Sequence, residues 1–141
     1  MAQRMNQSMP EAGEGWVPVN AGNHLIVLFH KDRRLVGGQD DDIVRPSIVV
    51  GVPGKGHQVI RFDPFSVGGH YHVLPTQDDK PTPFILKHGQ SHLAPALEYF
   101  DDPGLFRGLL AEADESEVAS LVTDNELRGA GRQIRQIWAA A

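Results

Sequence analysis

Hydrophobic residues fall into short runs along the first ninety residues, and turn-forming residues separate the runs. The runs span residues 23–30, 43–52, 57–62, 69–74 and 84–88. Runs of this length that are rich in β-branched and aromatic residues, and that end at glycine, proline or aspartate, are typical of strands. The pattern therefore predicts about five short strands. The run 23–30 is the most apolar, so we expect it to be buried on both faces of a sheet.

Two of these runs are predicted to form a hairpin. The sequence Pro-Gly-Lys-Gly at 53–56 separates 43–52 from 57–62 and is a strong turn signal. Pro46 has no N–H to donate, so it belongs at an edge, at a strand start or at a bulge. Strict alternation in the second run predicts two sets of side chains on opposite faces. One set is His57, Val59 and Arg61, and the other is Gln58, Ile60 and Phe62.

The pattern changes to a helical period after residue 91. Three short helices are predicted, from Ser91 to about residue 100, from Pro103 onward, and over 115–121. A longer helix follows, because Thr123-x-x-Glu126 is a capping box. One stripe of that helix is apolar and consists of Leu127, Ala130, Ile134, Ile137 and Ala141. Gly129 and Gly131 each weaken the helix by about 1 kcal/mol relative to alanine. The stripe must therefore pack against the chain's own sheet or against another subunit.

Strands followed by helices predict an α+β fold. We expect a β-rich N-terminal half, as a mostly antiparallel sheet or a partial barrel, followed by C-terminal helices. Residues 1–15 are polar and small and predict a flexible N-terminal arm, which leaves 16–141 as a single α+β domain.

Composition excludes several classes of function. The 141 residues contain no cysteine, which excludes disulfides, thiolate zinc sites and a cysteine nucleophile. The formal net charge of −5 disfavours nucleic acid as a partner. No apolar run approaches the roughly 20 residues of a membrane helix, and the first residues lack the apolar centre of a signal peptide. These features predict a cytoplasmic protein with no membrane partner.

The candidate chemistry lies in residues 61–75, which contain the single His-x-His of the chain. On a strand, His70 and His72 point to the same face, which offers two nitrogen ligands to Zn²⁺, or to Fe²⁺, Ni²⁺ or Cu²⁺. His88 and His92 follow within twenty residues, and they would share a face if they lay on one helix. The predicted metal site therefore consists of His70, His72, His88 and His92. Asp63 is predicted to be either a further ligand or an acceptor that orients an imidazole.

Three classes of function stay open at this point. The first is metal-assisted chemistry on a small molecule, with zinc the first choice of cofactor and iron or nickel after it. The second is a non-catalytic accessory or interaction subunit whose histidines are structural, and which forms a homo-oligomer or a larger complex. The third is a small-molecule binding module with an apolar cavity lined by Phe62, Phe65 and Tyr71. Whether the protein is an enzyme is not decided by its sequence.

A His-x-His on a strand of a small β-rich protein is similar to the metal-binding strand of cupins. The cupin pattern has a glycine six residues before the first histidine, where this chain has Pro64. It also has a glutamate shortly after the pair, where this chain continues with residues 73–77, Val-Leu-Pro-Thr-Gln. We therefore do not assign the chain to that family.

Overall fold

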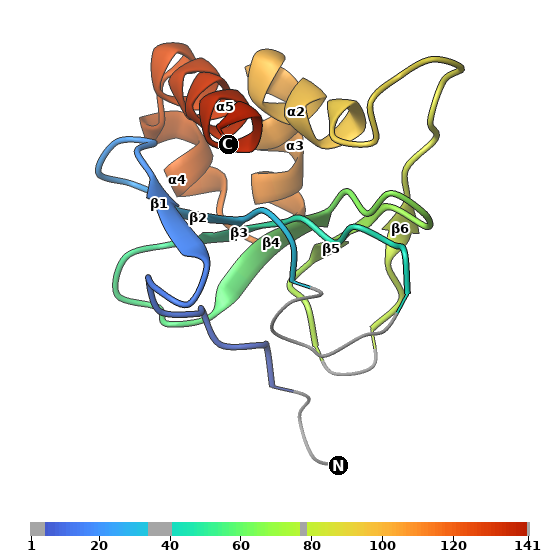
Figure 1. Ribbon diagram of the computed structural model, residues 1–141. Helices are drawn as coiled ribbons and strands as arrows, with labels where there is room; N and C mark the ends of the chain where they lie inside the picture. The colour runs from blue at the N-terminus through green and yellow to red at the C-terminus, as the bar shows by residue number, and fades with distance from the viewer. Residues whose placement is uncertain (1–4, 34–40, 77–78, 141) are drawn as a thin grey trace.

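The chain forms two layers, an antiparallel sheet and a group of helices that covers one of its faces (Figure 1). The structure is a computed structural model, and it describes residues 5–33, 41–76 and 79–140. Six strands follow one another across the sheet in chain order. They are β1 (Trp16–Val19), β2 (Ile26–His30), β3 (Ser47–Gly51), β4 (Gln58–Asp63), β5 (His70–Val73) and β6 (Thr82–Pro83). The predicted α+β class is confirmed, and the sheet is open rather than closed into a barrel.

The central strands are buried on both faces, as the apolar run 23–30 predicts. Every residue of β3 is buried, and so are the last four residues of β2. Alternate residues of these strands enter the main core beneath the helices, among them Val27, Phe29, Ile48 and Val50. The opposite face consists of the intervening residues and carries polar side chains among its apolar ones.

The described part of the N-terminal arm, residues 5–15, lies across that opposite face. Gln7 donates from its backbone N–H to the carbonyl of Pro75 at 2.8 Å and accepts from the backbone N–H of Gln58, also at 2.8 Å. Met9 donates to the carbonyl of Gly56 at 3.1 Å. These bonds join the arm to the start of β4, to the turn before it and to the residue Pro75 after β5. Figure 1 shows the arm running beneath the sheet, on the side away from the helices. The flexibility of the arm stays a prediction.

The alternation expected in β4 is interrupted. The ladder between β3 and β4 shifts register between Val50 and Gly51. Val59 and Ile60, which are adjacent, both enter the main core. Gln58 and Arg61 instead line one cavity on the opposite face. Strict alternation is therefore wrong for the start of this strand, because a bulge adds a residue on one side and rotates the side chains that precede it.

The last strand does not lie where the apolar run predicts it. Residues 84–88 form no strand, and β6 is the two-residue Thr82–Pro83 that precedes them. Pro81 and Pro83 lack backbone N–H groups, which limits pairing at this edge. Phe84 still donates to the carbonyl of Gly69 at 2.9 Å, but Ile85 is 87% exposed. Residues 84–88 are apolar enough for a strand, but they have no neighbouring strand with which to pair.

Four helices form the second layer. They are α2 (Ala94–Asp101), α3 (Pro103–Glu112), α4 (Ser116–Leu121) and α5 (Asp124–Ala139). The predicted capping box is confirmed, because Glu126 N donates to Thr123 Oγ1 at 3.1 Å and Thr123 N donates to Glu126 Oε1 at 2.8 Å. Leu127, Ala130 and Ile134 are fully buried in the chain's own core and Ile137 packs against it, so this part of the apolar stripe packs within the molecule. Ala141, the last predicted member of the stripe, lies outside the described residues.

Gly131 explains how α5 approaches α2 so closely. A Cβ atom at this position would lie 3.0 Å from Phe100 Cβ, tighter than ordinary carbon contacts of roughly 3.5–4.0 Å. The glycine that weakens the isolated helix therefore permits the packing that stabilises it. No helix within the described residues has the length and apolar character needed to cross a membrane.

Candidate metal centre

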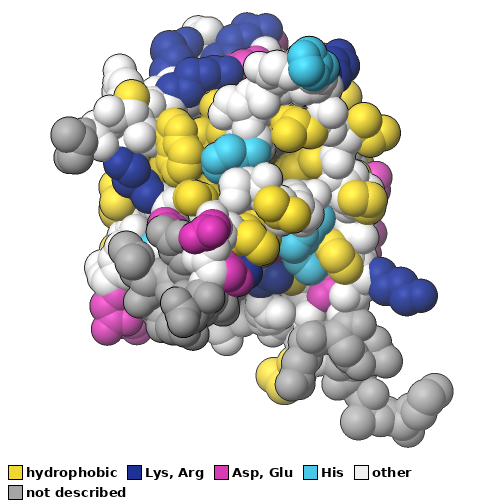
Figure 2. Space-filling model, turned by 45° about the vertical axis from the view of Figure 1, so that its right-hand side comes forward, with side chains coloured by type: hydrophobic (Ala, Val, Ile, Leu, Met, Phe, Trp, Pro, Cys, Tyr) yellow, Lys and Arg dark blue, Asp and Glu magenta, His cyan; other side chains and the backbone are white. Residues whose placement is uncertain are grey.

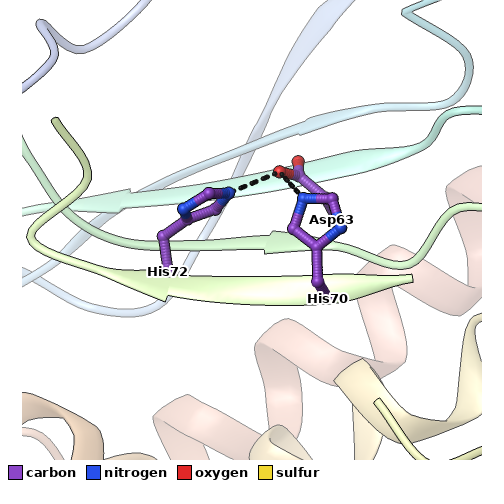
Figure 3. A group of neighbouring side chains, drawn as sticks. All are labelled: Asp63, His70 and His72. Carbon is purple, nitrogen blue, oxygen red and sulfur yellow. Dashed lines mark ion pairs between the residues drawn. The ribbon is translucent and has the colours of Figure 1, made fainter. Parts of the chain in front are cut away.

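Three side chains from β4 and β5 converge on the sheet face away from the helices. The antiparallel register pairs Asp63 with His70 and Arg61 with His72. Both imidazoles point from β5 toward Asp63, on the side of the sheet opposite the helices (Figure 3). Asp63 Oδ2 lies 3.2 Å from His70 Nε2 and 3.4 Å from His72 Nε2. The prediction that the two histidines share one face of one strand is confirmed.

Asp63 is the centre of this group and is a buried carboxylate. Its side chain is 2% exposed. It accepts a hydrogen bond from Ser47 Oγ at 2.7 Å and one from Arg61 Nε at 3.0 Å. Burial by itself would raise the pKa of Asp63, but the neighbouring imidazoles of His70 and His72, the charge of Arg61 and the Ser47 hydroxyl together hold the pKa far below its usual value. Asp63 is therefore ionised at neutral pH.

His70 is held so that Nε2 faces the carboxylate. Its Nδ1 lies 2.8 Å from the carbonyl oxygen of Gly68, and a carbonyl only accepts, so Nδ1 carries a proton. Its Nε2 then either carries a second proton toward Asp63 or presents a lone pair to a cation. In the absence of a cation the hydrogen bond to Asp63 raises the pKa of His70 above its usual value.

His72 is oriented by a second carboxylate. Its Nδ1 lies 2.7 Å from Asp79 Oδ2 and therefore donates to it. Its Nε2 lies 3.1 Å from Arg61 Nη2, which can only donate, so Nε2 is the acceptor in this contact. A carboxylate–histidine pair of this kind fixes the tautomer that leaves Nε2 free to bind a metal.

Two of the separations among the three ligand atoms fit a small tetrahedral ion. All three atoms lie within 4.8 Å of one another. Zinc bonds of about 2.0–2.1 Å in tetrahedral geometry separate two ligand atoms by about 3.3–3.4 Å. The two distances from Asp63 Oδ2, 3.2 and 3.4 Å, agree with that separation. The donor set of two imidazoles and one carboxylate also suits ferrous iron and nickel.

The structure does not form the four-histidine site. Within the described residues, neither His88 nor His92 joins the group of Asp63, His70 and His72. His88 lies in the exposed segment before α2. His92 Nδ1 donates to the carbonyl oxygen of Pro64 at 2.8 Å, and the ring of His92 packs edge-on against Trp138. The break at 89–91 keeps the two residues off a common helix.

The three aromatic residues predicted to line one cavity are divided between two places. Phe62 is fully buried and packs against Tyr71, Tyr99, Phe100 and Phe106 in the core beneath the helices. Phe65 lines a separate apolar pocket of about 200 Å³ together with Phe84 and His92. Hydrophobic side chains and histidines gather on the face of the molecule shown in Figure 2, which carries β6 and the segment leading to α2.

Two residues of the site were not found from the sequence. The sequence predicts only that Arg61 lies on a strand, and it does not single out Asp79. A carboxylate that orients an imidazole is a common companion of metal-binding histidines, but its place in the chain is not set by any local spacing. Comparisons with family models, with curated proteins and with solved structures found no match for this chain.

Proposed function

We propose that Asp63, His70 and His72 bind one divalent metal ion, with zinc the first choice and iron or nickel the alternatives. The observation that carries the proposal is the convergence of Asp63 Oδ2 and both Nε2 atoms within 4.8 Å, while each Nδ1 is engaged by an acceptor. Both imidazoles are thus held in the tautomer that a metal requires. Asp63 contributes the negative charge that favours a cation at this buried position.

Three protein ligands support a site that acts on a small molecule. Structural zinc sites have four protein ligands, whereas catalytic sites have three and keep one position for water or substrate. A metal held in this way supplies Lewis acidity or an activated water. The side chain of His70 is 20% exposed and that of His72 is 8% exposed, so the side of the group at His70 is the one closer to solvent.

A second candidate function is supported by Arg61. Its Nη2 donates to His72 Nε2, and its Nε donates to Asp63. The guanidinium therefore already neutralises Asp63 and engages one of the two ligand lone pairs. If this arrangement persists, the histidines are structural and the chain is a non-catalytic subunit of an oligomer or a complex. Metal binding requires Arg61 Nη2 to move away from His72.

Metal content distinguishes the two candidates. The tag-free chain is stripped of metal, incubated with Zn²⁺, passed through a desalting column, and examined by native mass spectrometry and elemental analysis. The double variant His70→Gln/His72→Gln removes both nitrogen ligands. The matched control His88→Gln/His92→Gln removes the same number of imidazoles from outside the group.

We expect one zinc per chain in the wild type and in the control, and none in the site variant. Circular dichroism establishes that each variant is folded. Loss of zinc in the control alone, or the absence of bound metal from a folded wild type, contradicts the proposal and favours the structural role. Native mass spectrometry reports the oligomeric state in the same measurement, which tests the subunit hypothesis directly.

A further inference from the structure

A second cavity lies on the same sheet face and is separated from the candidate metal centre by Arg61. Its volume is about 200 Å³. The sheet provides its floor, Trp16 of β1 and Arg33, three residues after β2, provide one wall, and the N-terminal arm provides the other. The lining residues are Gln7, Ser8, Pro10, Trp16, His30, Arg33, Val49, Gln58 and Arg61.

The cavity has more positive than negative charge. Arg33 and Arg61 both line it, and both reach the same carboxylate, Asp63, at 3.9 Å and 3.0 Å. No acidic side chain is among the described residues that line the cavity. His30 adds no charge, because its Nδ1 accepts from the backbone N–H of Asp32 at 3.1 Å, and burial lowers the pKa of its imidazole.

Arg33 has the donors with which an anion would bind. Its ion pair with Asp63, at 3.9 Å, is longer than a hydrogen bond. Its guanidinium also lies 5.9 Å from the centre of the Trp16 ring, which holds the group beside the cavity while leaving its N–H groups available. Arg61, by contrast, already donates to Gln7, Asp63 and His72.

The two guanidinium groups are placed at an electrostatic cost. Burial is the main cause that lowers the pKa of Arg33; the attraction of Asp63 raises it in part, and the repulsion from Arg61, which is smaller than that attraction, lowers it further. An anion in the cavity would offset the cost of burying Arg33, because it would face both cations in a partly dehydrated site.

We propose that this cavity binds a small oxyanion, a carboxylate or a phosphate, with Arg33 as the principal donor. Its volume of about 200 Å³ limits the ligand to a small one. Pockets for drug-sized ligands start at about 300 Å³. The side-chain amides of Gln7 and Gln58 add further polar groups to the lining.

This inference goes beyond the metal proposal. It is tested on metal-free protein, so that anion binding and metal binding can each be refuted without the other. The full chain, stripped of metal and transferred to a chelator-free Tris chloride buffer, is titrated by calorimetry with inorganic phosphate and, separately, with malonate. Chloride is adjusted to hold the ionic strength constant, since non-specific attraction to surface cations is screened equally in each titration.

We expect saturable binding of at least one of the two anions at one site per chain. Arg33→Gln should weaken it about tenfold or more, since a charge-assisted bond contributes about 1.5–3 kcal/mol. Arg128→Gln removes an exposed arginine from α5, in the helical layer, and should leave the affinity unchanged. Binding of phosphate alone or of malonate alone identifies the source of the oxyanion. The absence of saturable binding, or equal weakening by the two variants, overturns the proposal.

Discussion

Replacing Asp63 with asparagine removes a buried negative charge and keeps the shape of the side chain. Arg61, whose side chain is 11% exposed, then loses its ionic partner. Breaking a buried ion pair by removing one partner costs about 3–5 kcal/mol, because an uncompensated charge is left behind. The asparagine oxygen still accepts one bond, from Ser47 or from Arg61, so we expect the lower end, about 3 kcal/mol.

The measurement is urea unfolding followed by circular dichroism, in the presence of a chelator. A loss of about 3 kcal/mol is a large part of the roughly 5–15 kcal/mol that stabilises a domain. The matched control is Asp101→Asn, which breaks the pair between Asp101 and Arg135, whose side chains are 47% and 45% exposed. Water screens that pair, so the control should lose less than about 1 kcal/mol.

The pH dependence adds a second test of the same reasoning. The pKa of Asp63 is lowered, so its contribution is present above the unfolded-state value of 3.8 and is lost only as the pH falls far below it. The pKa of His70 is raised, so its contribution is present below the unfolded-state value of 6.5 and is lost as the pH rises through the folded-state pKa.

Asp63→Asn removes the ionic partner of His70, so it removes the contributions of both Asp63 and His70 to the free energy of unfolding. The stability difference between wild type and variant should be larger at about pH 6 than at about pH 9. Equal losses in Asp63→Asn and Asp101→Asn would refute the assignment of Asp63 as a buried ionic centre. A difference that grows as the pH rises would refute the proposed ion pair with His70.

Three further predictions address the site and the last helix. Asp79→Asn should weaken zinc binding about 10–100-fold, because the Asp79 carboxylate orients the His72 ring; competition with a chromophoric chelator measures this, and an unchanged affinity would show that His72 needs no orienting group. Ile134→Ala should cost about 2–5 kcal/mol in urea unfolding, because that side chain is fully buried, and its elution volume should not change since the contact is within the chain. Thr123→Ala should lower the free energy of unfolding by about 1 kcal/mol, because it removes the hydroxyl that caps the backbone N–H of Glu126. A urea midpoint equal to that of the wild type would mean that water replaces this cap at no cost.

The elements that the sequence predicted correctly are those set by neighbours close along the chain. The cap of α5 depends on residues three positions apart, and its apolar stripe repeats every three or four positions. The pairing of His70 with His72 on one face depends on residues two positions apart in an extended strand. Each of these relations is decided by backbone geometry within one turn or one pleat, so it can be read before the fold is known.

The remaining features depend on how separate segments meet. The sequence named Asp63 as a candidate ligand or acceptor, but the register between β4 and β5 set it opposite His70, and no local pattern fixed that register. The bulge beside Gly51 placed Gln58 and Arg61 on one face, against strict alternation. Residues 84–88 had strand-like composition but no strand to pair with. The sequence by itself determined that two imidazoles would lie side by side; only the tertiary structure decided which charges surround them, because register, bulges and strand partners are set by contacts between segments that lie far apart in the chain.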